Sequence, residues 1–244
     1  MNARSGATDV SGGKPMLTLL QGFELRRRGV EIELPHVAQK LIAFLAMQPR
    51  AVQRLFVAST LWIDADEERA NASLRTTLWR LSRANCELVR AVGSTLSLVP
   101  DLSVDCRVAA TRARCIIERP DDYCRHDIDL LGRRGELLPD WYDDWVLIER
   151  ERLRELRMRA LESLSRSLSA IGNYALAAEA ALAAIACEPL RESASRALVA
   201  AYMEEGNQAD ALRAYELYRE QLWGALGLKP SDRMEMLVAR LRCT

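Results

Sequence analysis

The sequence is poor in the groups that most catalytic and metal sites need. It has only two histidines, and none of its six cysteines forms a CxxC pair. Cys115, Cys124 and His126 match no standard zinc spacing. A Gly-rich phosphate loop ending in Lys and Ser or Thr is absent, as is a nucleophile elbow. We therefore expect no catalytic residues, no bound metal and no cofactor, and the protein is not expected to be an enzyme.

An excess of one charge and a long apolar run are also missing. The formal net charge is zero, and residues 16–104 carry 11 Lys and Arg against 9 Asp and Glu. Any affinity for DNA must therefore come from locally placed arginines. No apolar stretch reaches 18 residues, which predicts no transmembrane helix and no membrane partner. Sparse cysteines favour reduced thiols and a cytoplasmic location.

What the sequence does contain predicts a folded protein of two domains. Hydrophobic residues make up 49% and charged residues 28% of the 244 positions, a balance typical of globular proteins. Up to residue 104, strand-like segments, in which apolar residues recur at every second position, alternate with segments of helical periodicity. After residue 104 only helical periodicity is found. We expect a flexible tail over 1–15, a mixed domain over 16–104 and an all-helical domain over 105–244. The predicted class is mainly α with a small β component.

The order of elements in the first domain is that of a winged helix. A small antiparallel sheet over 16–34 precedes three helices, at about 36–47, 54–62 and 67–84. A hairpin follows over 88–98, and Gly93-Ser94 fits a type II′ turn. In such domains the third helix enters the major groove of DNA and the hairpin lies against the neighbouring backbone.

The predicted third helix has two different faces. Ala70, Leu74, Leu78 and Leu81 fall on one side, which predicts a buried stripe. The opposite side carries guanidinium and hydroxyl groups, which read base edges and bind phosphates. An ordinary surface helix with solvated arginines would show the same pattern, but the position just before a hairpin favours DNA binding. The candidate DNA-binding residues are Arg69, Ser73, Arg75, Thr76, Arg80 and Arg83, with Arg90 on the hairpin. Arg80 and Thr76 are the first choice for base edges.

Three segments of the first domain resemble a known family. Trp62, residues 70–83 (ANASLRTTLWRLSR) and residues 88–105 (LVRAVGSTLSLVPDLSVD) are similar to the OmpR-type winged helix of SARP-type bacterial activators. The resemblance implies DNA binding through the third helix, and a loop at about 63–68 that faces RNA polymerase. The second helix commonly begins with a polar pair in this family, but here it has Leu55-Phe56. These two residues are expected either to pack on the next domain or to form a protein contact.

The second domain predicts a helical repeat. Helices are expected at 105–118, 141–170 and 231–242, with a loop-rich stretch over 121–140. Gly172-Asn173 and Gly206-Asn207 lie 34 residues apart, the tetratricopeptide period. Trp141 and Trp145 could stack on a ligand, but packing against neighbouring helices is the favoured interpretation. Residues 136–157, 205–220 and 227–231 resemble the bacterial transcriptional activator domain of the same family.

Two functions remain open at this stage. The first is a sequence-specific transcriptional activator that binds double-stranded promoter DNA through helix 67–84. The resemblance suggests RNA polymerase as its partner and also a homodimer. The second is an adaptor or signal-sensing module that uses the helical repeats and does not bind DNA.

Overall fold

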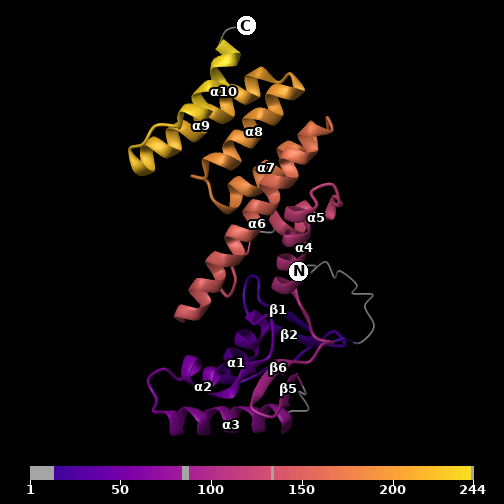
Figure 1. Ribbon diagram of the computed structural model, residues 1–244, viewed down its shortest axis with the longest axis vertical. Coiled ribbons are helices and arrows are strands. Elements are labelled where there is room, and N and C mark those ends of the chain that lie inside the picture. The colour runs from indigo at the N-terminus through magenta and orange to yellow at the C-terminus, as the bar shows by residue number, and fades with distance from the viewer. Residues whose placement is uncertain (1–13, 84–87, 133–134, 243–244) are drawn as a thin grey trace, which may run out of the picture. The chain divides into compact units, whose positions relative to one another are not determined.

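The computed structural model describes residues 14–83, 88–132 and 135–242 (Figure 1). Contacts divide the chain into two compact units, Met1–Val108 with Glu136–Arg150, and Ala109–Gly135 with Glu151–Thr244. Of the three boundaries, two fall inside helices, α4 (Asp105–Glu118) and α6 (Asp144–Ala170), and the third lies between Gly135 and Glu136. The expected class, mainly α with a small β component, is confirmed. The predicted tail at 1–15 lies almost wholly outside the described residues.

A four-stranded sheet opens the N-terminal unit. It contains β1 (Met16–Thr18), β2 (Glu24–Arg27), β3 (Val30–Glu31) and β7 (Ser103–Val104), in the order β3-β2-β1-β7. Strand β7 runs parallel to β1, and the other pairs are antiparallel. Arg28 and Gly29 both have positive φ, 51° and 78°, as the two-residue type I′ turn between β2 and β3 requires. The Asp105 carboxylate accepts the N–H groups of Leu19 and Leu20 at 2.9 and 3.0 Å, which fixes the chain after β1.

The rest of this unit completes a winged helix. The elements are α1 (His36–Met47), β4 (Val52–Gln53), α2 (Arg54–Leu61), α3 (Glu67–Arg83), β5 (Val89–Val92) and β6 (Thr95–Leu98). The short strand β4, which sequence patterns did not predict, joins the hairpin in an antiparallel sheet of order β4-β6-β5.

Helix α1 carries much of the core of this unit. Leu41, Ile42 and Leu45 on α1 are fully buried. The Arg107 guanidinium binds the end of α1, because it donates to three carbonyl oxygens there. The acceptors are Ala46 O at 2.6 Å, Leu45 O at 2.8 Å and Gln48 O at 2.9 Å.

Residues 136–150 pack on the winged helix, although the sequence placed them in the second domain. Leu137 bridges to Leu20, and the Leu138 N–H donates to Leu19 O at 2.9 Å. The Trp141 ring lies 6.2 Å from Phe23 and 6.4 Å from Trp145, centroid to centroid. The two tryptophans thus pack against protein, as favoured, but Trp141 precedes α6 instead of lying within it. Backbone pairing and aromatic contacts therefore assign this segment to the first unit.

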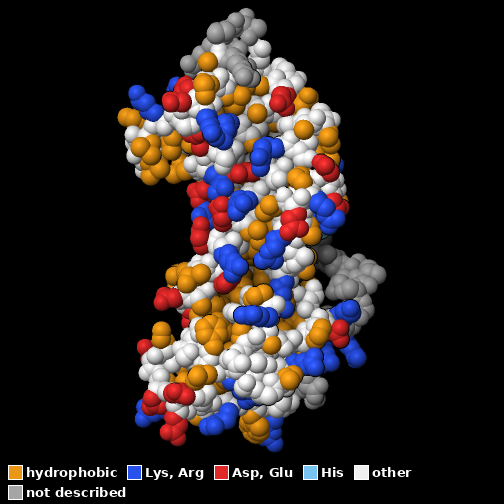
Figure 2. Space-filling view, viewed as in Figure 1, with side chains coloured by type: hydrophobic (Ala, Val, Ile, Leu, Met, Phe, Trp, Pro, Cys, Tyr) orange, Lys and Arg blue, Asp and Glu red, His pale blue; other side chains and the backbone are white. Residues whose placement is uncertain are grey.

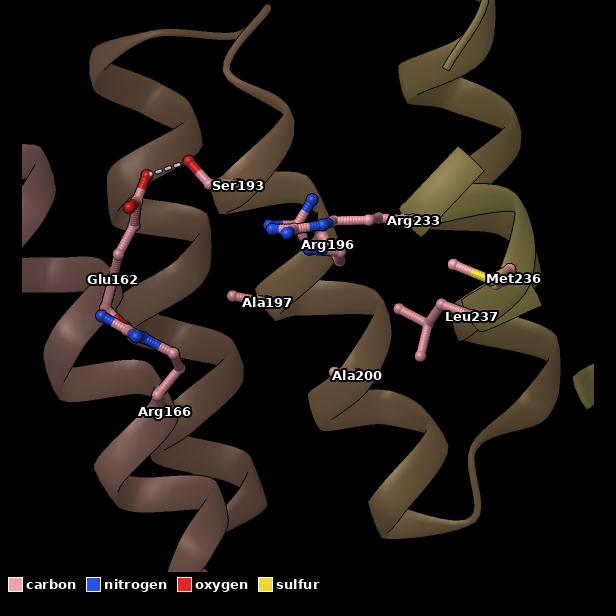
Figure 3. Close-up of a pocket in the computed structure, with 9 residues that line it drawn as sticks. All are labelled: Glu162, Arg166, Ser193, Arg196, Ala197, Ala200, Arg233, Met236 and Leu237. Atoms are coloured by element: carbon pink, nitrogen blue, oxygen red, sulfur yellow. Dashed lines mark hydrogen bonds between the residues drawn. The ribbon is translucent and has the colours of Figure 1, made fainter. Parts of the chain in front are cut away.

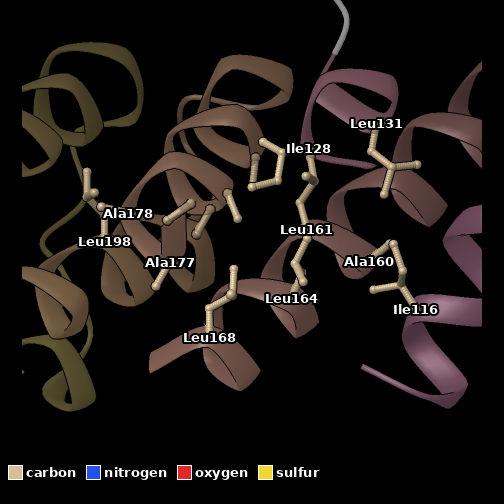
Figure 4. Close-up of a cluster of buried hydrophobic side chains, with 14 of the residues drawn as sticks. Ile116, Ile128, Leu131, Ala160, Leu161, Leu164, Leu168, Ala177, Ala178 and Leu198 are labelled. Atoms are coloured by element: carbon tan, nitrogen blue, oxygen red, sulfur yellow. The ribbon is translucent and has the colours of Figure 1, made fainter. Parts of the chain in front are cut away.

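The C-terminal unit is helical within its described residues. Besides parts of α4 and α6 it contains α5 (His126–Gly132), α7 (Tyr174–Cys187), α8 (Glu192–Glu205), α9 (Gln208–Leu226) and α10 (Asp232–Arg242). Leucines of α6 and alanines of α7 make its main core, together with Ile116, Ile128 and Leu131 (Figure 4). Small alanine side chains let the helix axes approach closely.

Helix α5 lies in the stretch expected to be loop-rich. A Cβ on Gly132 would meet the Ala183 Cβ at 2.8 Å, so this glycine allows close packing on α7 instead of a turn. Asp127, which is 2% exposed, accepts two hydrogen bonds of 2.6 Å from the Arg112 guanidinium. A buried ion pair of this kind has no periodic signature in the sequence.

The predicted 34-residue repeat is present as repeated geometry. Gly172 and Gly206 both have positive φ, 77° and 88°. The Asn173 N–H donates to Leu168 O at 2.9 Å, and the Asn207 N–H donates to Tyr202 O at 2.8 Å. These are the same helix-ending hydrogen bonds one period apart.

Two negative findings apply only to the residues described here. Among these residues, no helix combines the length and apolar character needed to cross a bilayer. Nor do they include a group of three or more His, Cys, Asp or Glu side chains placed to hold a metal ion.

Candidate nucleic-acid interface

Helix α3 is fixed at its start and along its inner face. The Asp66 carboxylate accepts the Arg69 N–H at 2.9 Å and acts as the N-cap. Acidic residues occupy the first turn and Arg80 and Arg83 the last, which suits the helix dipole. Thus the local sequence defines where the helix begins.

The buried stripe of α3 differs by one residue from the prediction. Ala70, Leu74, Thr77 and Leu81 are buried, whereas Leu78 is only half-buried. The Thr77 hydroxyl donates to Ser73 O at 2.8 Å, so it can be buried without losing its hydrogen bond. The stripe therefore follows the spacing i, i+4, i+7, i+11.

Most of the candidate residues lie on the exposed side of α3. Arg69, Arg75, Thr76, Arg80 and Arg83 are exposed, and Ser73 is half-buried. Arg69 makes an exposed ion pair with Asp66 at 3.3 Å. For the other three arginines, no carboxylate of the described residues lies within ion-pair distance. Their guanidinium groups are free to bind an external anion.

The Thr76 side chain has a defined orientation. Its hydroxyl donates to Ala72 O at 3.0 Å. The proton is therefore used within the helix, and the methyl group and an oxygen lone pair remain for a ligand. These groups suit contact with a thymine methyl or with an exocyclic amino group.

Trp79 is an exposed residue of this surface that the sequence did not single out. Its side chain is 56% exposed, and the Arg83 guanidinium carbon lies 4.6 Å from the ring centroid. At about 100° per residue, Trp79 points almost directly away from the buried stripe. Arg75 and Arg80 lie on either side of it, about 140° apart around the axis. The sequence signal that could have identified Trp79 is a large aromatic residue on an otherwise polar helix face.

The hairpin is built on the predicted turn. Gly93 has a φ of +55° and Ser94 does not have a positive φ, which fits type II′. The Ser94 carbonyl accepts the Arg54 N–H at 2.8 Å, so the turn is tied to the start of α2. Arg90 is exposed on β5, and Val92 beside the turn is 57% exposed.

Arg54, which the sequence did not single out, lies beside Arg75. A cavity of about 370 Å³ is lined by Arg54, Glu68, Asn71, Leu74 and Arg75. The buried Nε of Arg54 has no hydrogen-bond partner. Two guanidinium groups thus line one depression at the flank of α3.

Apolar side chains are exposed near the start of α3. Ile63 is 77% exposed, and Leu55 and Phe56 are 52% and 50% exposed. Phe56 also contacts Phe44, with ring centroids 5.8 Å apart. Figure 2 shows basic, acidic and apolar side chains mixed along the edge of the N-terminal unit that α3 forms in Figure 1. Such a mixture suits specific contacts better than general attraction to a polyanion.

Comparison with known proteins assigns the C-terminal half of the chain to a known domain and finds relatives over most of its length. Residues 131–242 match the model of the bacterial transcriptional activator domain. Over 226 residues, 85% of this chain, the sequence is 30% identical to the regulatory protein AfsR of Streptomyces coelicolor, of which it spans 22%. Mycobacterium tuberculosis EmbR, solved in complex with a low-affinity phosphopeptide, shares the fold. The TM-score is 0.70 at 19% identity, over 95% of this chain and 65% of that one. The chain thus carries a bacterial transcriptional activator domain in its C-terminal half, and over most of its length it is similar to SARP-type regulators.

Proposed function

We propose that this protein is a sequence-specific DNA-binding transcriptional regulator that places α3 in the major groove of promoter DNA. The observation that carries the proposal is the two-sided character of α3. One side is buried, and the other presents exposed arginines that have no carboxylate partner in the described residues. Such a helix, placed just before a hairpin, has the arrangement of a recognition helix.

Position around the α3 axis divides the tasks among the side chains. Thr76 and Arg80 contact base edges, and Trp79 contributes apolar contact near the groove floor. Arg75 lies on the other flank and, with Arg54, binds a backbone phosphate, while Arg90 on β5 binds another. Ser73, Arg69 and Arg83 border this surface and add contacts to the backbone. A bidentate arginine–guanine contact is worth about 1–3 kcal/mol of discrimination.

Activation requires a protein contact, and the α2–α3 region offers one. The connection after Leu61 exposes Ile63 and Asp64, and the half-exposed Leu55 and Phe56 lie on α2. An exposed apolar surface of this kind suits contact with another protein, and we assign this contact to RNA polymerase. We also propose that the protein acts on the nucleoid in the cytoplasm, with two protomers on adjacent sites.

The first test is selection of bound sequences from random duplex DNA, followed by mobility-shift titration of the full chain. Binding should weaken with salt, with a slope of about −0.9 in log K against log salt for each phosphate contacted. An adaptor that does not bind DNA would recover no enriched sequence and give no shift at low salt. That outcome would contradict the proposed function.

A further inference from the structure

A groove in the C-terminal unit gathers three arginines from three helices. It has a volume of about 550 Å³ and lies between α6, α8 and α10. Its lining includes Arg166, Arg196, Arg233, Ala197, Met236 and Leu237. Figure 3 shows Arg196 and Arg233 extending from α8 and α10 into the same space, with Arg166 on α6 at the other side. The groove has no part in the DNA-binding surface proposed above.

The carboxylates near the groove are already occupied. Glu162, which also lines it, accepts hydrogen bonds from Arg191 at 2.5 Å and Ser193 at 2.6 Å. Glu192 binds Arg196 at 3.1 Å and also accepts the Ser231 N–H at 2.8 Å. Glu162 thus pairs with Arg191 and Glu192 with Arg196, and neither carboxylate is paired with Arg166 or Arg233.

Two of the three arginines lack a carboxylate partner within the described residues. Arg166 donates only to the backbone oxygen of Glu162 in its own helix, at 3.2 Å. Arg233 is exposed, and the structure gives it no hydrogen bond or ion pair with any described side chain. Like charges that face one open groove repel each other unless an anion lies between them.

The groove also has an apolar part. Ala197 and Ala200 of α8 and Leu237 of α10 line it, and Met236 is 63% exposed at its edge. Methionine is a flexible side chain that adapts to varied apolar partners. A small inorganic anion would leave this apolar part uncovered, whereas a peptide could cover it.

We propose that the groove between α6, α8 and α10 binds an acidic peptide segment of a partner protein. Its carboxylates pair with Arg166, Arg196 and Arg233, and an apolar side chain between them packs on Met236 and Leu237. Guanidinium–carboxylate pairs are among the stronger hydrogen bonds in proteins. Stacked helical repeats commonly present an extended concave surface for such a segment.

The test measures peptide binding by the full chain with fluorescence anisotropy at low ionic strength. The probe is fluorescein-labelled Gly-Asp-Glu-Leu-Asp-Glu-Leu-Asp-Gly. The matched peptide replaces each Asp by Asn and each Glu by Gln. The test variant is the double substitution Arg166→Gln with Arg233→Gln, which removes two exposed charges that have no carboxylate partner. Arg159→Gln, an exposed arginine on α6 outside the groove lining, is the control.

The acidic peptide should bind the wild-type chain and the Arg159 variant alike, and the amide peptide should not bind. The double variant should lose at least about tenfold in affinity. Its melting temperature should match the wild type, which separates lost binding from lost folding. Arg233→Lys, which keeps the charge, should retain part of the affinity.

Two outcomes overturn the proposal. The first is that the acidic peptide fails to bind, or binds the wild type and the double variant equally. The second is that the double variant binds the peptide normally but loses affinity for duplex DNA, which would assign the groove to nucleic acid.

Discussion

Replacing Arg80 by Ala and, separately, Arg75 by Ala tests whether position around α3 decides what each arginine contacts. Both are exposed, and neither has a carboxylate partner in the described residues. Truncation should therefore change the free energy of unfolding by no more than about 0.5 kcal/mol. Their directions differ by about 140° around the helix axis, so they cannot both reach the same part of a groove.

The two variants should differ in specificity. If Arg80 pairs with a guanine, its loss removes about 1–3 kcal/mol of discrimination, or roughly 5- to 150-fold. That loss should be seen with the selected DNA site and not with a scrambled duplex. If Arg75 binds a phosphate, its loss should weaken both duplexes by the same factor and make the salt slope less negative by about 1.

The assay is fluorescence anisotropy with the selected and the scrambled duplex over a series of salt concentrations. Arg159→Ala, in the C-terminal unit, removes one positive charge as a control. It should change neither the specificity ratio nor the salt slope. The reasoning is refuted if Arg80→Ala weakens both duplexes equally, or if Arg75→Ala lowers the specificity ratio. A fall in unfolding free energy well beyond 0.5 kcal/mol would instead assign Arg80 a structural role.

Three further predictions concern stability. Arg107→Ala removes the charged donor from three carbonyl oxygens at the end of α1 and should cost about 1.5–3 kcal/mol in urea unfolding. Gly132→Ala should cost about 1–3 kcal/mol, because the new Cβ lies 2.8 Å from Ala183 Cβ, whereas Gly224→Ala on α9, with no atom within 4 Å, should stabilise. If Gly224→Ala were destabilising, helix propensity would not determine the direction of the stability change at this position. Burial opposes ionisation of Asp127, but hydrogen bonds from its arginine partner on α4 outweigh this and lower its pKa. Its ionised form therefore stabilises the fold at neutral pH, and this stability is lost as pH falls through the acidic range. Asp127→Asn should flatten the pH dependence of unfolding there, and an unchanged profile would contradict that role.

The sequence by itself determined the elements whose signals are local or periodic. Asp64 and Asp66 mark the start of α3 as alternative caps, of which the structure uses Asp66, and Gly93 marks the turn of the hairpin. The glycines 172 and 206 mark one repeat period. Each signal depends on backbone geometry within a few residues, such as a cap or a positive φ, so no distant contact is needed to interpret it.

Only the tertiary structure decided which elements pack together and how each helix is rotated. The spacing of α3 allowed Leu78 or Thr77 in the buried stripe, and packing chose Thr77, which left Trp79 facing outward. Residues 136–150 have helical and loop signals, but their partners lie more than a hundred residues earlier in the chain. Likewise, Arg166, Arg196 and Arg233 share no motif and meet only because three helices stack. Contacts between distant segments depend on the complementarity of whole surfaces, and a periodic pattern does not specify which surface is the partner.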